Sequence, residues 1–218
     1  MIAPSVKAVL FDLDGTLIDS EYFYYSNWAP ILADEFDLHI TFDDWLKNFA
    51  GHTLVRNVGF LKDQFGIETT EEFMWTATRA NYAKSDMTTI RLMPFAKETL
   101  ENLRQKGLRM ALVTSSYKTT VDTVLGHHGL LDYFEFFITR ELVENPKPNP
   151  EPYELATQKL GLTKEQIIAV EDTITGFTSA TAAGLTCVAV SKHTTERQRL
   201  AVAKYLIEDL SNLLQLIV

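Results

Sequence analysis

Short apolar runs alternate with helix-like segments through the second half of the chain, and this alternation limits the fold more than any other feature. After Pro94, segments with helical periodicity separate four apolar runs at residues 108–116, 134–140, 167–172 and 186–191. An earlier run, residues 6–11, is apolar apart from Lys7, as in a strand buried on both faces. Strands that alternate with helices form parallel sheets with right-handed crossovers. We therefore predict an α/β fold with a doubly wound parallel sheet.

A block without predicted strands separates the first strand from this alternating part. Residues 19–86 resemble a series of helices, the first of which we expect to be kinked or broken near Pro30. We therefore predict two domains: residues 1–18 and 91–218 form the α/β core, and residues 19–90 form an inserted all-helical domain. Ligands of doubly wound cores bind outside the carboxyl ends of the strands.

The charge of the chain limits its partners. Acidic residues outnumber basic residues by 29 to 20, which gives a net charge of −9. Such a surface repels phosphate backbones, so we expect no nucleic acid partner. No apolar segment is long enough to span a membrane and the N-terminus does not resemble a signal peptide, so we expect no membrane partner and a cytoplasmic location. We further expect a monomer or a weak homodimer. The single cysteine, Cys187, excludes an intrachain disulfide and is expected to be a buried structural thiol.

Polar residues gather where the predicted strands end and in one loop between them. They are Asp12, Asp14, Thr114, Ser115, Lys147, Glu171 and Asp172. Taken singly, Asp14 is an ordinary turn residue, Thr114 a helix N-cap and Lys147 a solvated loop residue. Glu171 and Asp172 are ordinary caps for the next helix. Taken together, carboxylates at two strand ends, a hydroxyl at a third and a lysine predict a site for a cation and an anion. Hard oxygen ligands favour Mg²⁺, and Mg²⁺ beside a lysine favours phosphate.

Four motifs in this order and spacing carry a family resemblance: FDLDGTL, VTSS, KPNPEPY and VEDTITG. Together they resemble the haloacid dehalogenase superfamily of phosphotransferases, and the resemblance covers the whole chain. An insert directly after the first motif is similar to the branch with a helical cap, which includes β-phosphoglucomutase and small sugar-phosphate phosphatases. The resemblance implies a Rossmann-like core, a helical cap domain, Mg²⁺ as cofactor and a small phosphorylated metabolite as substrate.

The resemblance also implies catalytic roles. Asp12 is expected to be the nucleophile that forms an aspartyl-phosphate, and Asp14 the acid and base for the leaving oxygen and the attacking water. The Thr114 hydroxyl, the Ser115 amide and the Lys147 ammonium are expected to hold the transferring phosphoryl group. The expected reaction is therefore hydrolysis of a small phosphomonoester.

The metal ligands implied by the resemblance come from the first and fourth motifs. Mg²⁺ is expected to bind one oxygen of Asp12, the backbone carbonyl of Asp14 and the carboxylate of Asp172. Glu171 is a further candidate ligand, direct or through water. The metal would offset the repulsion between an anionic nucleophile and an anionic substrate.

The motifs depart from the family pattern at two positions. Glu151 stands where the third motif often has Asp, and Thr173 stands where the fourth often has Ser. Both changes are conservative and remove no required group. The dehalogenase branch lacks the second aspartate of the first motif, so Asp14 favours phosphoryl transfer over dehalogenation.

The segment AGHTLVRN in the helical insert is the candidate substrate loop. Members of this branch often carry Gly, a basic or polar residue, then Ser or Thr there, and the matching residues are Gly51, His52 and Thr53. Gly51 also fits the end of one helix and Thr53 the N-cap of the next, and we expect both descriptions to hold at once.

Four alternatives remain open. A mutase of the β-phosphoglucomutase type places a His in the first cap helix and an Arg just past the cap Gly; here these positions are Tyr24 and Leu54, with Arg56 close by. An inorganic pyrophosphatase uses the same core residues. A phosphonate hydrolase uses a cap lysine where this chain has His52. A regulatory binding protein on the same scaffold would be expected to lose catalytic residues, and all of them are present.

Overall fold

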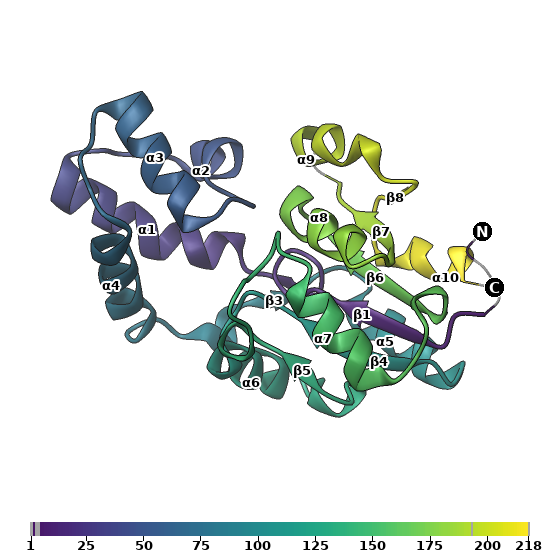
Figure 1. The fold of residues 1–218 in the computed structure, drawn as a ribbon. Helices are drawn as coiled ribbons and strands as arrows, with labels where there is room; N and C mark the ends of the chain where they lie inside the picture. The colour runs from purple at the N-terminus through teal and green to yellow at the C-terminus, as the bar shows by residue number, and fades with distance from the viewer. Residues whose placement is uncertain (1, 3–4, 193, 218) are drawn as a thin grey trace. The chain divides into compact units, whose positions relative to one another are not determined.

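The computed structural model describes residues 2, 5–192 and 194–217, which form two compact units (Figure 1). One unit consists of Met1–Asp19 and Arg91–Val218, and the other of Ser20–Ile90. The first contains a parallel sheet with helices, and the second contains helices only, so we call them the α/β unit and the helical unit. Among the described residues, no helix is both long and apolar enough to cross a membrane.

A six-stranded parallel sheet forms the centre of the α/β unit. Its strands lie in the order β5 (Phe137–Ile138), β4 (Arg109–Val113), β1 (Ala8–Phe11), β6 (Ile167–Glu171), β7 (Thr186–Val190) and β8 (Tyr205–Ile207). Every pair of neighbouring strands is parallel. The carboxyl ends of β4, β1 and β6 therefore meet at one edge of the sheet. This confirms the predicted doubly wound α/β fold.

Helices cover both faces of this sheet. The helices α7 (Glu151–Leu160) and α8 (Ile174–Ala182) lie on one face, and α5 (Ala96–Gln105) lies on the other (Figure 1). Successive side chains of a strand point to opposite faces. Ala8 and Leu10 of β1 accordingly join the core beneath α7 and α8, and Cys187 of β7 is buried in the same core. The unit also contains α6 (Lys118–His127), α9 (Thr194–Arg199) and α10 (Leu213–Leu216).

The helical unit is built from α1 (Glu21–Phe36), α2 (Phe42–Asn48), α3 (Leu54–Phe65) and α4 (Glu71–Tyr82). Threonine side chains cap the last three, each accepting a backbone N–H from the residue three positions on. The break expected near Pro30 was wrong, because α1 runs through Pro30 as one element. Burial of Trp28, Ile31 and Leu32 on this helix offsets the hydrogen bond that proline cannot make.

Several short elements differ from the sequence prediction. β5 has two residues, although a longer strand was expected at residues 134–140, because the chain enters a 3₁₀ turn at Arg140–Leu142. β8, α9 and α10 were not predicted. The strands β2 (Ile18–Asp19) and β3 (Arg91–Leu92) pair antiparallel where the chain leaves and re-enters the α/β unit. Strands this short give too few positions for an alternating pattern.

Candidate active site

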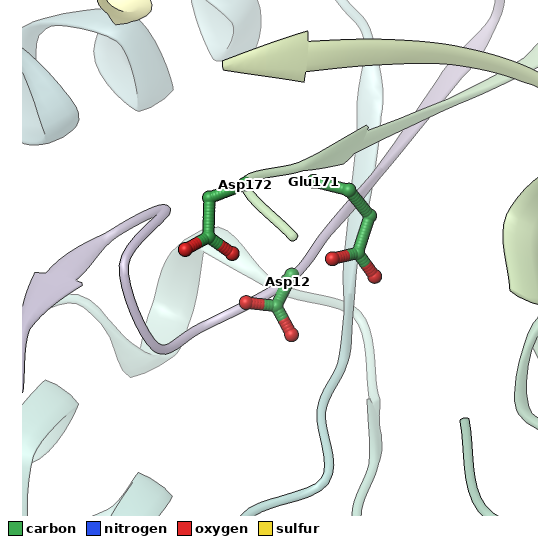
Figure 2. A group of neighbouring side chains, drawn as sticks. All are labelled: Asp12, Glu171 and Asp172. Atoms are coloured by element: carbon green, nitrogen blue, oxygen red, sulfur yellow. The ribbon is translucent and has the colours of Figure 1, made fainter. Parts of the chain in front are cut away.

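Asp12 is the first residue after β1 and lies buried at the edge where the central strands end. Its backbone N–H donates to the carbonyl of Val170 at 3.0 Å, so the β1–β6 pairing fixes its position. The residue is 7% exposed. Carboxylate oxygens of Asp12, Glu171 and Asp172 lie within 4.8 Å of one another (Figure 2). The sheet thus brings acidic residues from the first and fourth motifs into one cluster.

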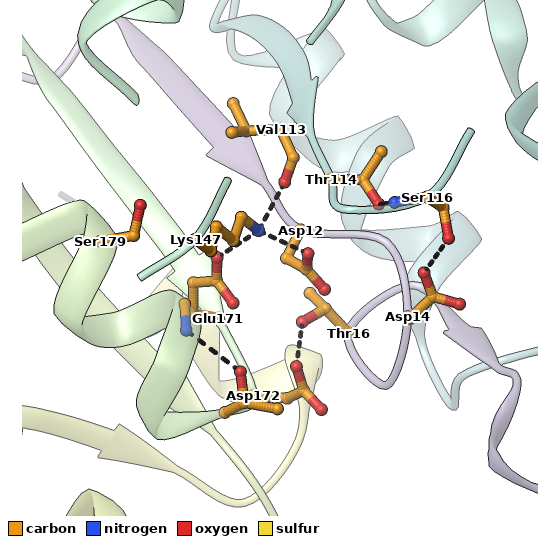
Figure 3. Close-up of polar contacts among 12 residues, drawn as sticks. Asp12, Asp14, Thr16, Val113, Thr114, Ser116, Lys147, Glu171, Asp172 and Ser179 are labelled. Carbon is orange, nitrogen blue, oxygen red and sulfur yellow. Dashed lines mark hydrogen bonds and ion pairs between the residues drawn. The ribbon is translucent and has the colours of Figure 1, made fainter. Parts of the chain in front are cut away.

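Lys147 reaches this cluster from the loop before α7. Its Nζ donates to Asp12 Oδ1 at 2.6 Å, to Glu171 Oε1 at 2.6 Å and to the Val113 carbonyl at 2.7 Å (Figure 3). An ammonium has three protons, so all three are used. The lysine was expected to hold a phosphoryl group, whereas here its donors hold the nucleophile candidate and its neighbour.

The Lys147 loop is closed by Glu151, the residue that departs from the family motif. Its carboxylate accepts from the backbone N–H groups of Glu144 and Asn145, both at 2.8 Å, and from the Asn145 side chain at 2.9 Å. Glutamate at position 151 therefore ties the two ends of the segment together. The substitution keeps a structural carboxylate in the loop.

Burial dominates the electrostatics of the cluster. It raises the pKa of Asp12 to about 8; Lys147 opposes this rise, and Glu171 and Asp14 add to it. Burial alone would lower the pKa of Lys147, but Asp12 and Glu171 outweigh it, so the lysine pKa is raised and the ammonium stays charged. Three carboxylates around one ammonium leave an excess of negative charge, which suits a divalent cation.

The surroundings of Asp172 also fit a bound cation. The Thr16 hydroxyl donates to Asp172 Oδ1 at 3.5 Å. Gly15 has a φ of 79°, and a Cβ at that position would overlap the Asp172 carboxylate. Glycine is therefore needed both for the turn after β1 and for the space that Asp172 occupies. Carboxylate oxygens held this way are the hard ligands that Mg²⁺ prefers.

Asp14 takes a different partner from Asp12. The Ser116 hydroxyl donates to Asp14 Oδ2 at 2.6 Å, and the Ser116 N–H donates to Thr114 Oγ1 at 2.9 Å (Figure 3). Thr114 is buried and closes a turn after β4. Its alternative description as a helix cap was wrong, because Tyr117 is the N-cap of α6. The turn after β4 thus fixes both a hydroxyl and the orientation of the Asp14 carboxylate.

Glu171 is held from two sides. It is 1% exposed, and the hydroxyl of buried Tyr153 on α7 donates to the same Oε1 that accepts from Lys147. On the other side, a Cβ at Gly176 of α8 would overlap its carboxylate. Burial and the charge of Glu171 raise the pKa of Tyr153 well above its usual range, so its hydroxyl stays a donor. Glu171 does not cap α8, which takes Thr173 as its N-cap.

The predicted site residues fall into two groups. The α/β unit contains Asp12, Asp14, Thr114, Ser115, Lys147, Glu171 and Asp172. Hydrogen bonds and close carboxylates group Asp12 with Lys147, Glu171 and Asp172, and Ser116 joins Asp14 to Thr114, whereas Ser115 is exposed. Gly51, His52 and Thr53 lie in the helical unit, where Gly51 has a φ of 71° and Thr53 caps α3. Sequence reasoning missed Ser116, Tyr153 and Gly176. All three stand at the ends of quoted motifs, but residue type alone did not mark them.

Two side chains at the start of α3 brace the candidate substrate loop from within the helical unit. Asn57 is buried, and its Nδ2 donates to the Phe49 carbonyl at 3.0 Å. Arg56 donates to the carbonyl of Asn48, and its guanidinium lies 4.6 Å from the centroid of the Phe60 ring. Both residues therefore hold the end of α2, immediately before Gly51.

Known proteins are similar to this chain in sequence and in fold. The family model of the haloacid dehalogenase-like hydrolases matches residues 9–190. The chain is 31% identical over 207 residues to validoxylamine A 7'-phosphate phosphatase of Streptomyces hygroscopicus subsp. limoneus, covering 94% of each chain. It is 28% identical over 215 residues to pyrophosphatase PpaX of Oceanobacillus iheyensis, covering 98% of this chain and 97% of that one.

A solved structure agrees with these relatives. CbbY from Rhodobacter sphaeroides, determined in complex with phosphate, superposes with a TM-score of 0.78 at 21% identity, covering 95% of this chain and 96% of that one. This likeness concerns the fold alone. The family model covers most of the chain, and both of these relatives match the chain nearly end to end. The chain therefore belongs to the family of haloacid dehalogenase-like hydrolases.

Proposed function

We propose that the chain is a Mg²⁺-dependent phosphatase that hydrolyses a small phosphomonoester, a sugar phosphate or similar metabolite, through an aspartyl-phosphate on Asp12. The observation that carries this proposal is the buried contact of 2.6 Å between Asp12 and Lys147, beside an acidic cluster suited to a divalent cation. Relatives named as phosphatases support the same chemistry.

The residues support a two-step reaction. In the first step, a carboxylate oxygen of Asp12 attacks phosphorus, the bond from phosphorus to the ester oxygen breaks, and Asp14 gives that oxygen a proton. In the second, Asp14 takes a proton from water, the water oxygen attacks phosphorus, and the bond between phosphorus and the Asp12 oxygen breaks. Ser116 keeps the Asp14 carboxylate oriented for both proton transfers. The products are an alcohol and inorganic phosphate.

The proposed Mg²⁺ ligands are the side chains of Asp12 and Asp172 and the backbone carbonyl of Asp14. When bound, Mg²⁺ supplies positive charge that lowers the pKa of Asp12 and offsets its repulsion from the phosphate. Glu171 Oε1 already accepts from two donors, which favours a contact with the metal through water. Lys147 acts as the counter-ion of Asp12 and fixes the orientation of its carboxylate for attack on phosphorus.

Hydroxyl and amide groups are proposed to bind the transferring phosphoryl oxygens. Thr114 uses an oxygen lone pair for Ser116, which leaves its hydroxyl proton for a phosphate oxygen. The Ser115 amide follows in the same turn. Gly51, His52 and Thr53 are proposed as substrate-binding residues of the helical unit, so His52→Ala should raise KM or shift preference among substrates and leave phosphoenzyme formation intact.

The decisive experiment traps the covalent intermediate. Enzyme, Mg²⁺ and a ³²P-labelled substrate found in a screen of phosphorylated metabolites are mixed and quenched in acid, and protein-bound label is counted. Wild type should carry label on Asp12, and Asp12→Asn should carry none and lose at least about 10³-fold in turnover. Asp122→Asn, which changes an exposed aspartate paired with Lys118, is the matched control and should behave as wild type. Label retained in Asp12→Asn would refute the proposal.

A second candidate function is hydrolysis of inorganic pyrophosphate. It is favoured by the similarity to pyrophosphatase PpaX along nearly the whole chain. The core residues would act alike, with phosphate in place of an alcohol as the leaving group. Comparison of kcat/KM for pyrophosphate with that for each phosphomonoester in the same assay distinguishes the two, and a preference for pyrophosphate over every monoester would replace the first proposal.

The mutase alternative needs a cation for a second phosphate, and Arg56 was the candidate. Its guanidinium contacts the Asn48 carbonyl and the Phe60 ring, which favours a structural role. We therefore expect β-glucose 1-phosphate, if it is a substrate, to release phosphate stoichiometrically even with a trace of glucose 1,6-bisphosphate. Rapid formation of glucose 6-phosphate with little free phosphate would establish a mutase instead.

A further inference from the structure

Tyr153 approaches the site from beneath, on the face of the sheet covered by α7 and α8. Its side chain is fully buried, and its hydroxyl donates to Glu171 Oε1. The Lys147 Nζ lies 5.3 Å from the centroid of its ring and donates to the same Oε1 at 2.6 Å. Glu171 Oε1 therefore accepts from both Tyr153 and Lys147, and Lys147 in turn contacts Asp12, the proposed nucleophile.

This chain of contacts leaves little freedom at each link. The three protons of Lys147 are directed to Asp12, Glu171 and the Val113 carbonyl. Displacement of the Glu171 carboxylate would release one of them and allow the ammonium to rotate away from Asp12. Glu171 is itself confined, because the α8 backbone at Gly176 closes one side and the Tyr153 hydroxyl the other.

A buried phenol needs an acceptor, but a backbone carbonyl would satisfy it equally well. Here the acceptor is a charged carboxylate next to the nucleophile, and hydrogen bonds to charged groups are the stronger kind. We propose that Tyr153 is a positioning residue, whose hydroxyl fixes Asp12 for attack by acting through Glu171 and Lys147. The inference rests on the proposed function, because it assigns Tyr153 to the formation of the aspartyl-phosphate.

The first test removes only the hydroxyl. Tyr153→Phe keeps the ring and its packing, and Tyr133→Phe is the matched control, since the Tyr133 hydroxyl donates to Glu101 at 3.1 Å outside the site. Tyr153→Phe should lower kcat and the single-turnover rate of phosphoenzyme formation about tenfold, as loss of an outer partner of a site does. Its KM should change less than about twofold, because the hydroxyl touches no substrate group. Tyr133→Phe should match wild type in both.

The second test needs no turnover and no metal. Metal-free protein is treated with an amine reagent such as trinitrobenzenesulfonate, and the modification rate of Lys147 is followed by peptide mass spectrometry. Exposed Lys159, on the same helix as Tyr153, is the internal reference. Lys147 should be modified faster in Tyr153→Phe than in wild type, while Lys159 is modified at the same rate in both.

A double-mutant cycle tests the route through Glu171. If Tyr153 acts through Glu171, Tyr153→Phe should cost little further in a Glu171→Gln background, because the partner whose charge it stabilises is already changed. Full additivity would overturn the proposal. So would unchanged kcat and unchanged Lys147 protection in Tyr153→Phe, or an equal loss in Tyr133→Phe. Absence of phosphoenzyme in wild type would refute the proposed function, whereas the labelling of Lys147 would still decide whether Tyr153 restrains the lysine.

Discussion

Among the described residues, both units bury neutral polar side chains, but only the α/β unit buries ionisable ones. In the described part of the α/β unit, the ionisable residues Asp12, Lys147 and Glu171 are buried, and Lys147 donates to both carboxyl groups. The buried polar residues described in the helical unit are all neutral: Ser20, Asn27, Asn57 and Thr78. Burial of a charge costs far more than burial of an amide or hydroxyl. The buried charged side chains therefore lie in the candidate active site, whereas the buried neutral side chains of the helical unit stabilise its fold.

Removal of the metal should give the largest effect and should fall on the α/β unit. Among the described residues, the cluster of Asp12, Glu171 and Asp172 is the group suited to hold a metal. Exhaustive chelation with EDTA should abolish phosphate release, and added Mg²⁺ should restore it. Asp172→Ala should raise the Mg²⁺ concentration needed for half-maximal activity, whereas Asp122→Ala should leave it unchanged. Full phosphatase activity after chelation would contradict the proposal that the buried carboxylates bind a catalytic metal.

Gly176→Ala should be the next largest effect. The new Cβ would overlap the Glu171 carboxylate and push it away from Lys147, and a misplacement of about 1 Å can cost about 10²-fold in rate. Gly126→Ala in α6 is the matched control, because its nearest neighbour would be a Leu131 methyl at 3.5 Å and alanine favours a helix. The measurements are kcat/KM and the melting temperature. Equal activity of both variants would show that Glu171 is not confined as described.

Asn57→Ala should separate stability from chemistry in the helical unit. The variant loses the shorter of two hydrogen bonds to the Phe49 carbonyl and keeps the one from the His52 N–H at 3.4 Å, so the free energy of unfolding should fall by about 0.5–1.5 kcal/mol. Phosphoenzyme formation from p-nitrophenyl phosphate should hardly change, because no charge of the α/β cluster is touched. Asn102→Ala, an exposed asparagine bonded to the Glu98 carbonyl, is the control for denaturant titration. A large fall in phosphoenzyme formation would break the distinction between the two units.

Phe95→Gly should give the smallest effect, a gain in stability. Phe95 precedes α5 with a φ of 64°, and an L-residue in this region costs about 1–2 kcal/mol that glycine avoids. Its side chain is 46% exposed, so little packing is lost, and the net gain should be about 1 kcal/mol. Asp37→Gly, at a similar φ of 52°, should gain less because aspartate tolerates this conformation better. Chemical denaturation measures both, and a destabilised Phe95→Gly would mean that the exposed ring contributes to folding.

The strand ends could be predicted because apolar runs and the charges that follow them are local patterns. Asp12 and Glu171 each follow a run of buried residues, and parallel strands place such ends together. The alternation of strands and helices predicts that the sheet is parallel, but it does not predict the order of the strands. β8 escaped prediction because three residues, of which only Ile207 is fully buried, show no period.

The side-chain contacts among the site residues could not be predicted, because they depend on the directions of side chains from elements distant in the sequence. Tyr153 has the sequence pattern of a buried helix residue, and nothing near it in the chain indicates that its hydroxyl meets Glu171. Ser116 was passed over for Ser115, since neighbouring serines differ only in where the turn points them. Gly176 resembled any glycine near a helix start until the carboxylate beside it was located.

The central place of β1 in the sheet has a consequence for how the protein is made. β1 ends at Phe11 and is synthesised well before its two neighbours, which begin at Arg109 and Ile167. The helical unit is one continuous segment, Ser20–Ile90, and domains generally fold as units during synthesis. Protease resistance of ribosome-bound chains should therefore arise in the helical segment before it arises in β1. A prematurely released chain would then carry a folded helical unit and an Asp12 without Lys147, the contact on which the proposed phosphatase activity depends.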